Sequence, residues 1–185
     1  AWIRPVATGA NTWEMAMGML TAGGSIWTMI YKIPQNGQAQ IHTRSSAVDL
    51  GIAPANNTWY YIALGGGTIG STGATGWIIT TDGTVYTAST QNEATTFTEL
   101  SLMNNVGFGG EWVNGRVENA IVWNVKLTTN ELLQQMWSRV PIVQTNSINS
   151  WNPLNQHTGL MDYSGNGNNF TSIGGTLTTE DGPPI

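Results

Sequence analysis

The chain has 185 residues, a formal net charge of −5, no Cys, and only 9% charged against 40% hydrophobic residues. This length suits one domain with a substantial core, and the hydrophobic content excludes a disordered chain. The lack of Cys excludes disulfides, thiolate metal sites and Cys nucleophiles. Six scattered basic residues do not form a basic patch, and no apolar run is long enough for a bilayer, so we predict no nucleic-acid partner and no membrane insertion.

Strand patterns fill the first third of the chain. Residues 13–19 alternate, which predicts a strand with Trp13 and the three Met residues on one face. Residues 25–33 form a second candidate strand. The Asn-Gly pair within residues 34–37 is a strong hairpin signal, so residues 38–44 are expected to return antiparallel.

The middle of the chain continues the same pattern. Residues 58–64 form a compact apolar strand, and the Gly-rich run 65–76 is expected to be a loop. Asp82 and Gly83 separate two strand patterns and both tolerate positive φ, which predicts a type I′ hairpin. Three further strands are expected at residues 100–103, 106–108 and 116–123.

A single helix is expected near residues 128–138. Thr128 and Glu131 have the spacing of a capping box, in which each side chain bonds the other residue's backbone amide. An apolar face follows, and Pro141 limits the helix to two or three turns. That face is formed by Leu132, Leu133, Met136 and Trp137.

Many short strands with turn signals and one short helix predict an all-β fold, a two-sheet antiparallel β-sandwich or jelly roll spanning residues 1–185 as one domain. Five of the nine Trp residues lie on apolar patterns and are expected in the core. They are Trp13, Trp27, Trp59, Trp123 and Trp137.

An ordered set of segments resembles the laminin-G-like (LamG) branch of the concanavalin A-like lectin/glucanase superfamily. The set covers most of the chain, and its order makes it more specific than any one motif. The segments are Thr58–Leu64, Thr81–Gly83, Val106–Gly110 with Asn114–Val117, Ile121–Asn124 with Leu127–Leu132, Trp151–Leu154, and Asp162–Asn168.

Two departures from the LamG pattern concern the ends of the chain. The Trp-Pro-Leu and Asp-x-Ser-Gly segments often open such domains, but here they close the chain, as in some phage and bacterial proteins of this type. Residues 1–5 look like an internal strand. We therefore expect the first N-terminal strand to be absent from this sequence or supplied by another subunit.

Glycoside hydrolysis is the best-known chemistry of the superfamily and needs two closely spaced carboxylates. The enzyme branch carries them on one strand as Glu-x-Asp-x-x-Glu, a run that this sequence lacks. Glu111 and Glu118 are seven residues apart across a Gly turn. A Gly-x-Ser-x-Gly nucleophile elbow is also absent, so the chain is not expected to be an enzyme.

Candidate ligand-binding residues come from one loop and one strand. Trp112 lies in a Gly-rich loop beside Glu111 and Asn114, where an exposed ring can stack on a sugar. The alternatives are a ring folded over the core or buried against another subunit. His42 and Arg44 share one face of a strand, which is either a ligand-binding face or simply a solvated one.

The segment 162–169 is the candidate metal site. It concentrates Asp162, Asn166 and Asn168, and LamG-like domains often bind a structural Ca²⁺ through such oxygen ligands. Because the loop contains one carboxylate, the alternative is an Asx-turn in which the two glycines supply positive φ. No other cofactor is expected.

The resemblance implies a non-enzymatic module that recognises carbohydrate in adhesion, located outside the cell or on a virion surface. The alternative is a structural capsid-decoration, fibre or surface-assembly protein that contacts other surface or virion proteins, or copies of itself, as a homo-oligomer. An open edge strand at the N-terminus favours this alternative, since such edges pair with other chains. A glycoside hydrolase is the third alternative.

Overall fold

The computed structural model describes residues 1–6, 14–21, 27–32, 37–43, 46–66, 73–90, 97–103, 114–154, 160–171, 182–183 and 185. The described part is mostly β, with antiparallel strands and one α-helix. The chain divides into two compact units. We call Ile3–Arg116 the N-terminal unit, and Ala1–Trp2 with Val117–Ile185 the C-terminal unit.

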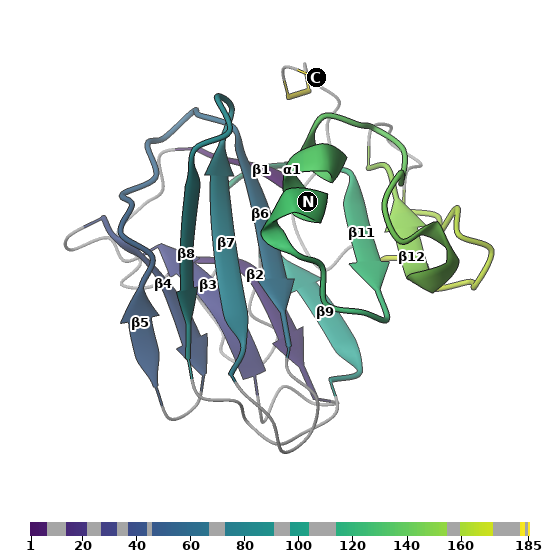
Figure 1. Cartoon of the computed structure of the whole chain (residues 1–185), viewed down its shortest axis with the longest axis horizontal. Coiled ribbons are helices and arrows are strands. Elements are labelled where there is room, and N and C mark those ends of the chain that lie inside the picture. Colours follow the sequence, from purple (N-terminus) through teal and green to yellow (C-terminus); the bar gives the residue numbers. More distant parts are fainter. Residues whose placement is uncertain are drawn as a thin grey trace. The chain divides into compact units, whose positions relative to one another are not determined.

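One five-stranded sheet of the N-terminal unit has the order β5-β4-β3-β2-β9 (Figure 1). Every pairing in it is antiparallel, which confirms the expected hairpin between the second and third strand patterns. The members are β2 (Glu14–Leu20), β3 (Trp27–Lys32), β4 (Ala39–Thr43), β5 (Ala47–Asp49) and β9 (Glu99–Leu102).

The other five-stranded sheet has the order β10-β1-β6-β7-β8. Strand β1 lies between β10 and β6, so the prediction of an internal strand at residues 1–5 is confirmed. The boundary between the two units falls within β1 and β10. The members are β1 (Trp2–Pro5), β6 (Tyr60–Gly65), β7 (Thr75–Thr80), β8 (Val85–Ser89) and β10 (Gly115–Glu118).

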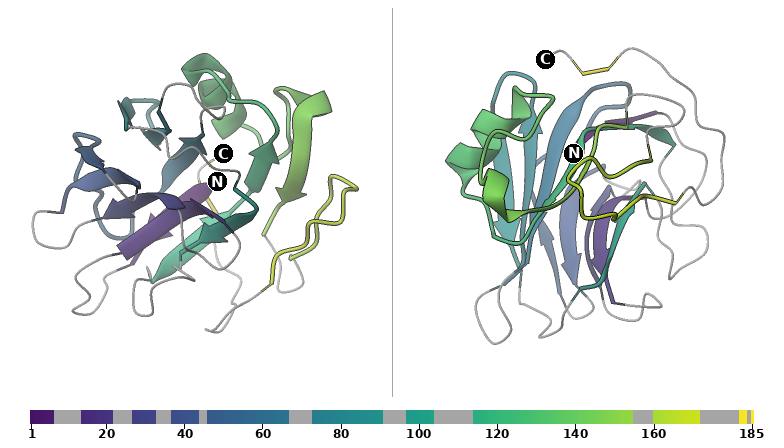
Figure 2. Two further views of the ribbon diagram at one scale, coloured as in Figure 1. Left: turned by 90° about the horizontal axis from the view of Figure 1, so that it is seen from below. Right: turned by 90° about the vertical axis from the view of Figure 1, so that its right-hand side faces the viewer.

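The two sheets of the N-terminal unit approach each other at Gly76 of β7. A Cβ atom there would lie 3.4 Å from Ile30 Cδ1 in β3 and 3.4 Å from Ile41 Cβ in β4. Figure 1 shows β7 and β8 in front of β3 and β4, and Figure 2 gives two further views. Aliphatic side chains fill this region, and burying each of them contributes about 1.5–3 kcal/mol. Leu20, Ile30, Ile41, Ile78 and Ile79 are almost completely buried.

Strand β2 contains a β-bulge. Met15 pairs with Tyr31 while Met17 pairs with Ile30, so Ala16 is an extra residue on this strand. An extra residue interrupts the alternation of side chains. The single face expected for Met15 and Met17 is therefore wrong, and residues 14–18 are all buried. Trp13, the first residue of that predicted face, lies outside the described residues.

The hairpin at Asp82 and Gly83 is confirmed, but its turn type differs from the prediction. Gly83 has φ +87°, whereas Asp82 does not have positive φ. The Gly83 amide donates to the Thr80 carbonyl and the Thr80 amide donates to the Thr84 carbonyl. This is a three-residue loop with left-handed Gly rather than a type I′ turn. The Asp82 carboxylate accepts a hydrogen bond from the Thr84 amide at 3.0 Å, and this bond stabilises the three-residue loop.

The C-terminal unit contains the antiparallel pair β11 (Ala120–Trp123) and β12 (Ile148–Asn152), the helix α1 (Thr129–Met136) and a 3₁₀ turn η1 (Thr145–Ser147). The single strand predicted at residues 116–123 is wrong. Asn119 has φ +55°, a left-handed conformation that ends β10 before β11 begins. The two strands therefore belong to different sheets.

The predicted helix and its capping box are confirmed. The Glu131 amide donates to Thr128 Oγ1 over 3.3 Å, and the Thr128 amide donates to Glu131 Oε2 over 2.8 Å. Trp137 contradicts the predicted core, because the helix ends at Met136 and Trp137 is a C-cap residue with 51% of its surface exposed. Among the described residues, no helix has the length and apolar character needed to cross a bilayer.

Candidate functional site

Three polar side chains meet on β4 and β5 and form what we call the β4–β5 cluster: Gln40, His42 and Asp49. Gln40 Nε2 donates to Asp49 Oδ1 at 2.5 Å, and Gln40 Oε1 lies 2.7 Å from His42 Nε2. Gln40 and Asp49 are paired in the ladder, and His42 is two residues further along the same face.

The burial of β4 alternates, which determines the direction of the cluster. Ala39, Ile41 and Thr43 are buried, whereas Gln40 and His42 are half-buried. Asp49 is exposed on the edge strand β5. The cluster therefore faces away from the core and presents amide, imidazole and carboxylate groups whose positions are fixed by their mutual hydrogen bonds. Such groups can donate to and accept from the hydroxyls of a polar ligand.

Of the other residues predicted to bind ligand, only Asn114 lies among the described residues. Arg44, Glu111 and Trp112 lie outside the described residues. Asn114 is exposed, and its backbone carbonyl accepts from the Val6 amide at 2.7 Å.

Asn114 and His42 lie far apart in the N-terminal unit. A Cβ atom on the neighbouring Gly115 would lie 2.7 Å from Met103 Cε, just beyond β9. In the sheet, β2 and β3 lie between β9 and β4. Adjacent strands are about 4.8 Å apart, so β4 and β9 are separated by roughly 14 Å. The structure does not bring His42 and Asn114 together.

The candidate metal loop is organised around Asp162. One carboxylate oxygen, Oδ1, accepts from the amides of Trp151 and Ser164 at 2.9 Å each. The other, Oδ2, accepts from the Asn168 amide at 2.9 Å. Burial raises the pKa of Asp162, but these hydrogen bonds lower it by a larger amount. The resulting pKa is about 2. The carboxylate is therefore ionised near neutral pH.

Asn166 and Asn168 both anchor the loop to a bulge in β12. The bulge arises because Val122 pairs with Ser150 while Trp123 pairs with Ile148, which leaves Asn149 as the extra residue. The carbonyl of Asn149 accepts from Asn166 Nδ2 at 3.1 Å and from Asn168 Nδ2 at 2.9 Å.

These contacts are those of the Asx-turn alternative. Gly165 and Gly167 have φ of +87° and +76°, as that alternative requires. The described residues contain no group of three or more His, Cys, Asp or Glu side chains that could hold a metal ion. Calcium binding by Asp162, Asn166 and Asn168 stays a prediction.

Large exposed hydrophobic side chains form a second kind of candidate site. All six found among the described residues belong to the C-terminal unit. Trp137, Val140 and Ile142 follow α1 and are each about half exposed, and Met161 and Tyr163 flank Asp162 with 58% and 60% exposure. The sixth is Val125.

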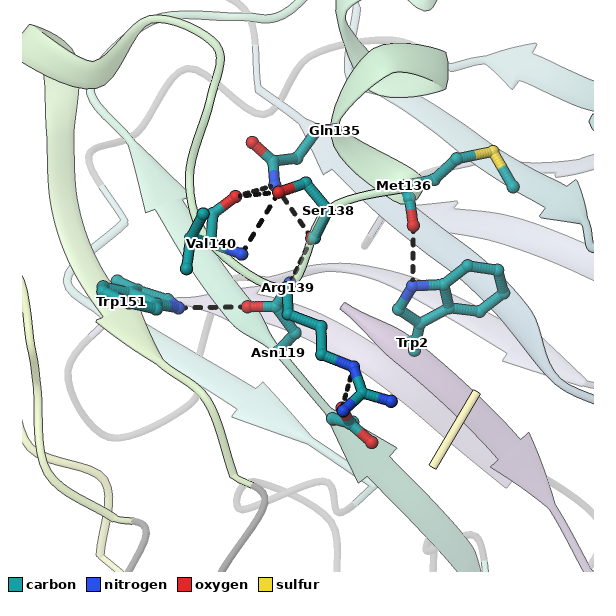
Figure 3. A network of polar contacts seen from close by, with 9 residues as sticks. Trp2, Asn119, Gln135, Met136, Ser138, Arg139, Val140 and Trp151 are labelled. Atoms are coloured by element: carbon teal, nitrogen blue, oxygen red, sulfur yellow. Dashed lines mark hydrogen bonds and ion pairs between the residues drawn. The ribbon is translucent and has the colours of Figure 1, made fainter. Parts of the chain in front are cut away.

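A network of polar contacts in the C-terminal unit holds the segments that carry some of these exposed side chains (Figure 3). Asn119 Nδ2 donates to the Ser138 carbonyl at 3.0 Å, and Asn119 Oδ1 accepts from Trp151 Nε1 at 3.0 Å. The Trp151 ring in turn contacts Tyr163, with centroids 5.9 Å apart. The network holds the segment after α1 and the Asp162 loop in fixed positions.

Several residues that the structure places in these sites were not predicted from the sequence. Gln40 was detectable, since it lies two residues from His42 on an alternating strand. Asp49 was not, because its contact with Gln40 depends on strand register. Tyr163 lies inside a turn-rich segment, where no periodicity distinguishes exposed from buried aromatic residues.

Comparisons with protein-family models, with curated proteins and with solved structures found no match for this chain. The resemblance to LamG domains therefore stays a prediction, and the functional argument depends on the residues of this chain.

Proposed function

We propose that this chain is a non-enzymatic carbohydrate-recognition module of the LamG type, in which the two sheets of the N-terminal unit form a β-sandwich. The close approach of β7 to β3 and β4 at Gly76 supports the sandwich. The antiparallel pairings within both sheets support it as well. The fold alone does not determine function, so the proposal depends on the site.

The observation that carries the proposal is the Gln40 side chain, which contacts both Asp49 and His42 on the outward face of the sheet. Sugars present adjacent hydroxyls that both donate and accept hydrogen bonds. A cluster whose amide, carboxylate and imidazole groups are already oriented loses little side-chain entropy when it binds them. Glycoside hydrolysis needs a pair of carboxylates, and this cluster supplies one.

A glycan array followed by titration calorimetry tests the proposal. We expect the wild-type protein to bind a subset of glycans, and His42→Ala and Asp49→Asn to weaken that binding at least tenfold. Glu99→Gln is the matched control, because Glu99 is an exposed carboxylate on the opposite edge strand of the same sheet. Absence of glycan binding by the wild type, or equal loss in the control, would contradict the proposal.

A second role, assembly through protein contacts, is favoured by a separate observation. The large exposed hydrophobic side chains among the described residues all belong to the C-terminal unit. Exposed apolar patches on a folded protein commonly mark interaction sites. Sedimentation velocity on the purified protein tests this role, and a strict monomer at every concentration would exclude self-assembly. We expect either role to operate outside the cell or on a virion surface.

A further inference from the structure

We propose that Arg4 and Arg116 bind an oxyanion, the carboxylate or phosphate group of a ligand, on the sheet that contains β1 and β10. This site lies on a different sheet from the β4–β5 cluster. It goes beyond both proposed functions, because neither of them uses the β10-β1-β6-β7-β8 sheet to bind a ligand. All of its residues belong to the N-terminal unit.

Strand pairing brings the two arginines together. β1 and β10 are neighbours in the sheet, and the Val6 amide donates to the Asn114 carbonyl at 2.7 Å. A Cβ atom on Gly115 would lie 3.1 Å from Pro5 Cα. One step forward along β10 is thus one step back along β1, so the strands are antiparallel and the next facing pair consists of the two arginines.

Both arginine side chains project away from the other five-stranded sheet. A Cβ atom on Gly115 would lie 2.7 Å from Cε of Met103, the residue that follows β9, so position 115 faces that sheet. Successive side chains of a strand alternate between its two faces. Arg116 and the facing Arg4 therefore lie on the opposite face, where both are half-buried.

Arg4 lacks the acceptor that a buried guanidinium donor needs. Its Nε atom is buried and has no hydrogen-bond partner among the described residues. An unsatisfied buried donor is unfavourable, and so are like charges that face each other on paired strands. Glu118, the carboxylate two residues beyond Arg116 on β10, lies 4.0 Å from Arg139. An oxyanion between Arg4 and Arg116 would remove both unfavourable features.

Trp59 positions the guanidinium of Arg4. The Arg4 Cζ atom lies over the Trp59 ring, 5.9 Å from its centroid. This cation–π contact restricts the orientation of the guanidinium. The N–H donors of a guanidinium form a planar fork that matches two oxygens of one carboxylate or phosphate. The arginines are therefore ligand-binding residues, and Trp59 is a positioning residue.

Asn114 adds an uncharged donor beside the arginine pair. It is exposed, and it precedes Arg116 by two residues, the spacing of side chains that share one face of a strand. Its side-chain amide can donate to the same oxyanion. The sequence analysis predicted Asn114 as a ligand-binding residue, and this site assigns that residue a ligand of stated chemistry.

A titration followed through the arginine Nε–H resonances tests the site. The chain has four arginines, so each resonance can be assigned by replacing one arginine at a time. At constant ionic strength, we expect phosphate or acetate to shift the Arg4 and Arg116 resonances along one common saturation curve. The Arg139 resonance should not move. Absence of a saturable shift with either anion would overturn the proposal.

Arginine variants separate specific binding from general charge. Arg4→Gln and Arg116→Gln should each weaken binding about tenfold, because each removes one fork of donors. Arg4→Lys keeps the charge without the planar fork and should weaken binding about fivefold, which also covers the case in which Arg4→Gln fails to fold. Arg139→Gln is the matched control, since it removes an exposed arginine of the C-terminal unit. Equal binding by Arg4→Gln and the wild type, or an equal loss in Arg139→Gln, would contradict the site.

The positioning role of Trp59 has its own readout. Trp59→Leu should weaken binding and should also shift the Arg4 Nε–H resonance in the ligand-free protein. Trp59→Phe keeps an aromatic ring and should restore most of both properties. A purely structural role of Trp59 would leave the ligand-free Arg4 resonance unchanged, so that result would overturn the positioning role.

Four probes identify what carries the oxyanion. Phosphate and glucose 6-phosphate are compared with acetate and glucuronate, and the tighter pair identifies the acidic group. Tighter binding of a sugar than of its free ion would show that a carbohydrate carries the group, whereas equal binding would assign the site to the free ion. Glycan binding at the β4–β5 cluster is measured separately, so either site can fail without the other.

Discussion

Trp151 donates its indole N–H to Asn119 Oδ1 over 3.0 Å, and this bond connects β12 to the residue that separates β10 from β11. Asn119 is 1% exposed and has φ +55°. Its Nδ2 donates to the Ser138 carbonyl beyond α1 (Figure 3). One side-chain amide thus connects the strand pair of the C-terminal unit to the segment that follows its helix.

Replacing Asn119 should therefore be among the more destabilising single changes in the C-terminal unit. Asn119→Ala removes both side-chain hydrogen bonds and places a residue with a Cβ, but without a compensating amide, in the left-handed region. We expect a loss of about 3 kcal/mol in the free energy of unfolding. Urea denaturation followed by Trp fluorescence measures it.

Asn119→Gly separates the two contributions, since it removes the same hydrogen bonds but tolerates positive φ. The loss should be smaller than for Asn119→Ala by about 1 kcal/mol. Equal losses would show that the left-handed backbone contributes no strain, and a negligible loss in both variants would show that the hydrogen bonds do not stabilise the fold.

The Asp162 loop should make stability depend on pH in the acid range. Burial raises the pKa of Asp162, but hydrogen bonds from amides lower it by more, to about 2, which is below the ordinary value of 3.8. Its contribution is therefore fully present above about pH 4 and is lost as the pH falls toward 2. After allowance for solvent exposure, the contribution is about 1 kcal/mol.

Asp162→Asn provides the comparison for this prediction. The variant should be less stable than the wild type at neutral pH, and the difference should shrink between about pH 4 and 2. Urea denaturation at a series of pH values measures both curves. Parallel curves for the two proteins across this range would exclude Asp162 as the titrating group.

Calcium should have little effect on the stability of the Asp162 loop. Both carboxylate oxygens already accept backbone N–H groups, and the Asn166 and Asn168 side-chain nitrogens donate to the Asn149 carbonyl. We expect the melting temperature to be the same in EDTA and in excess Ca²⁺. A ligand that binds only the folded state must raise the melting temperature. If Ca²⁺ raises the melting temperature of the wild type but not that of Asp162→Ala, the calcium alternative is established.

The sequence predicted elements whose signals are local. The capping box of α1 was predictable because Thr128 and Glu131 interact within one turn, and the β7–β8 hairpin because Asp82 and Gly83 form the turn themselves. Strand patterns predicted most strands of both sheets, but not the short edge strand β5. The alternation also gave the outward face of His42.

The failures come from features that depend on neighbouring strands or on a single backbone angle. The bulge at Ala16 follows from pairing with β3, which no local pattern reveals. Asn119 interrupts the single strand predicted at residues 116–123 by adopting positive φ. This conformation is stabilised by hydrogen bonds with Ser138 and Trp151, which belong to distant segments. Trp137 fits a helical face in the sequence but lies just beyond the end of the helix.

Gly73 should tolerate no larger residue. A Cβ atom at this position would overlap the Thr90 backbone carbonyl oxygen, so the backbone must move to accommodate it. Gly73→Ala is therefore expected to destabilise the protein by about 3 kcal/mol, at the upper end of the range for overpacking. Gly51→Ala is the comparison, since no atom lies within 4 Å there and only its φ of +79° opposes a side chain. If Gly73→Ala proves no more destabilising than Gly51→Ala, the close approach of residues 73 and 90 is wrong.

The capping box provides a measure of how much α1 contributes to the C-terminal unit. Thr128→Ala removes the hydroxyl that accepts from the Glu131 amide, and N-cap truncations cost about 1 kcal/mol. Thr128→Ser keeps the hydroxyl and should be close to wild type. Urea denaturation of both variants measures the difference in unfolding free energy. Equal stability of the two variants would show that the Thr128 hydroxyl does not stabilise the helix.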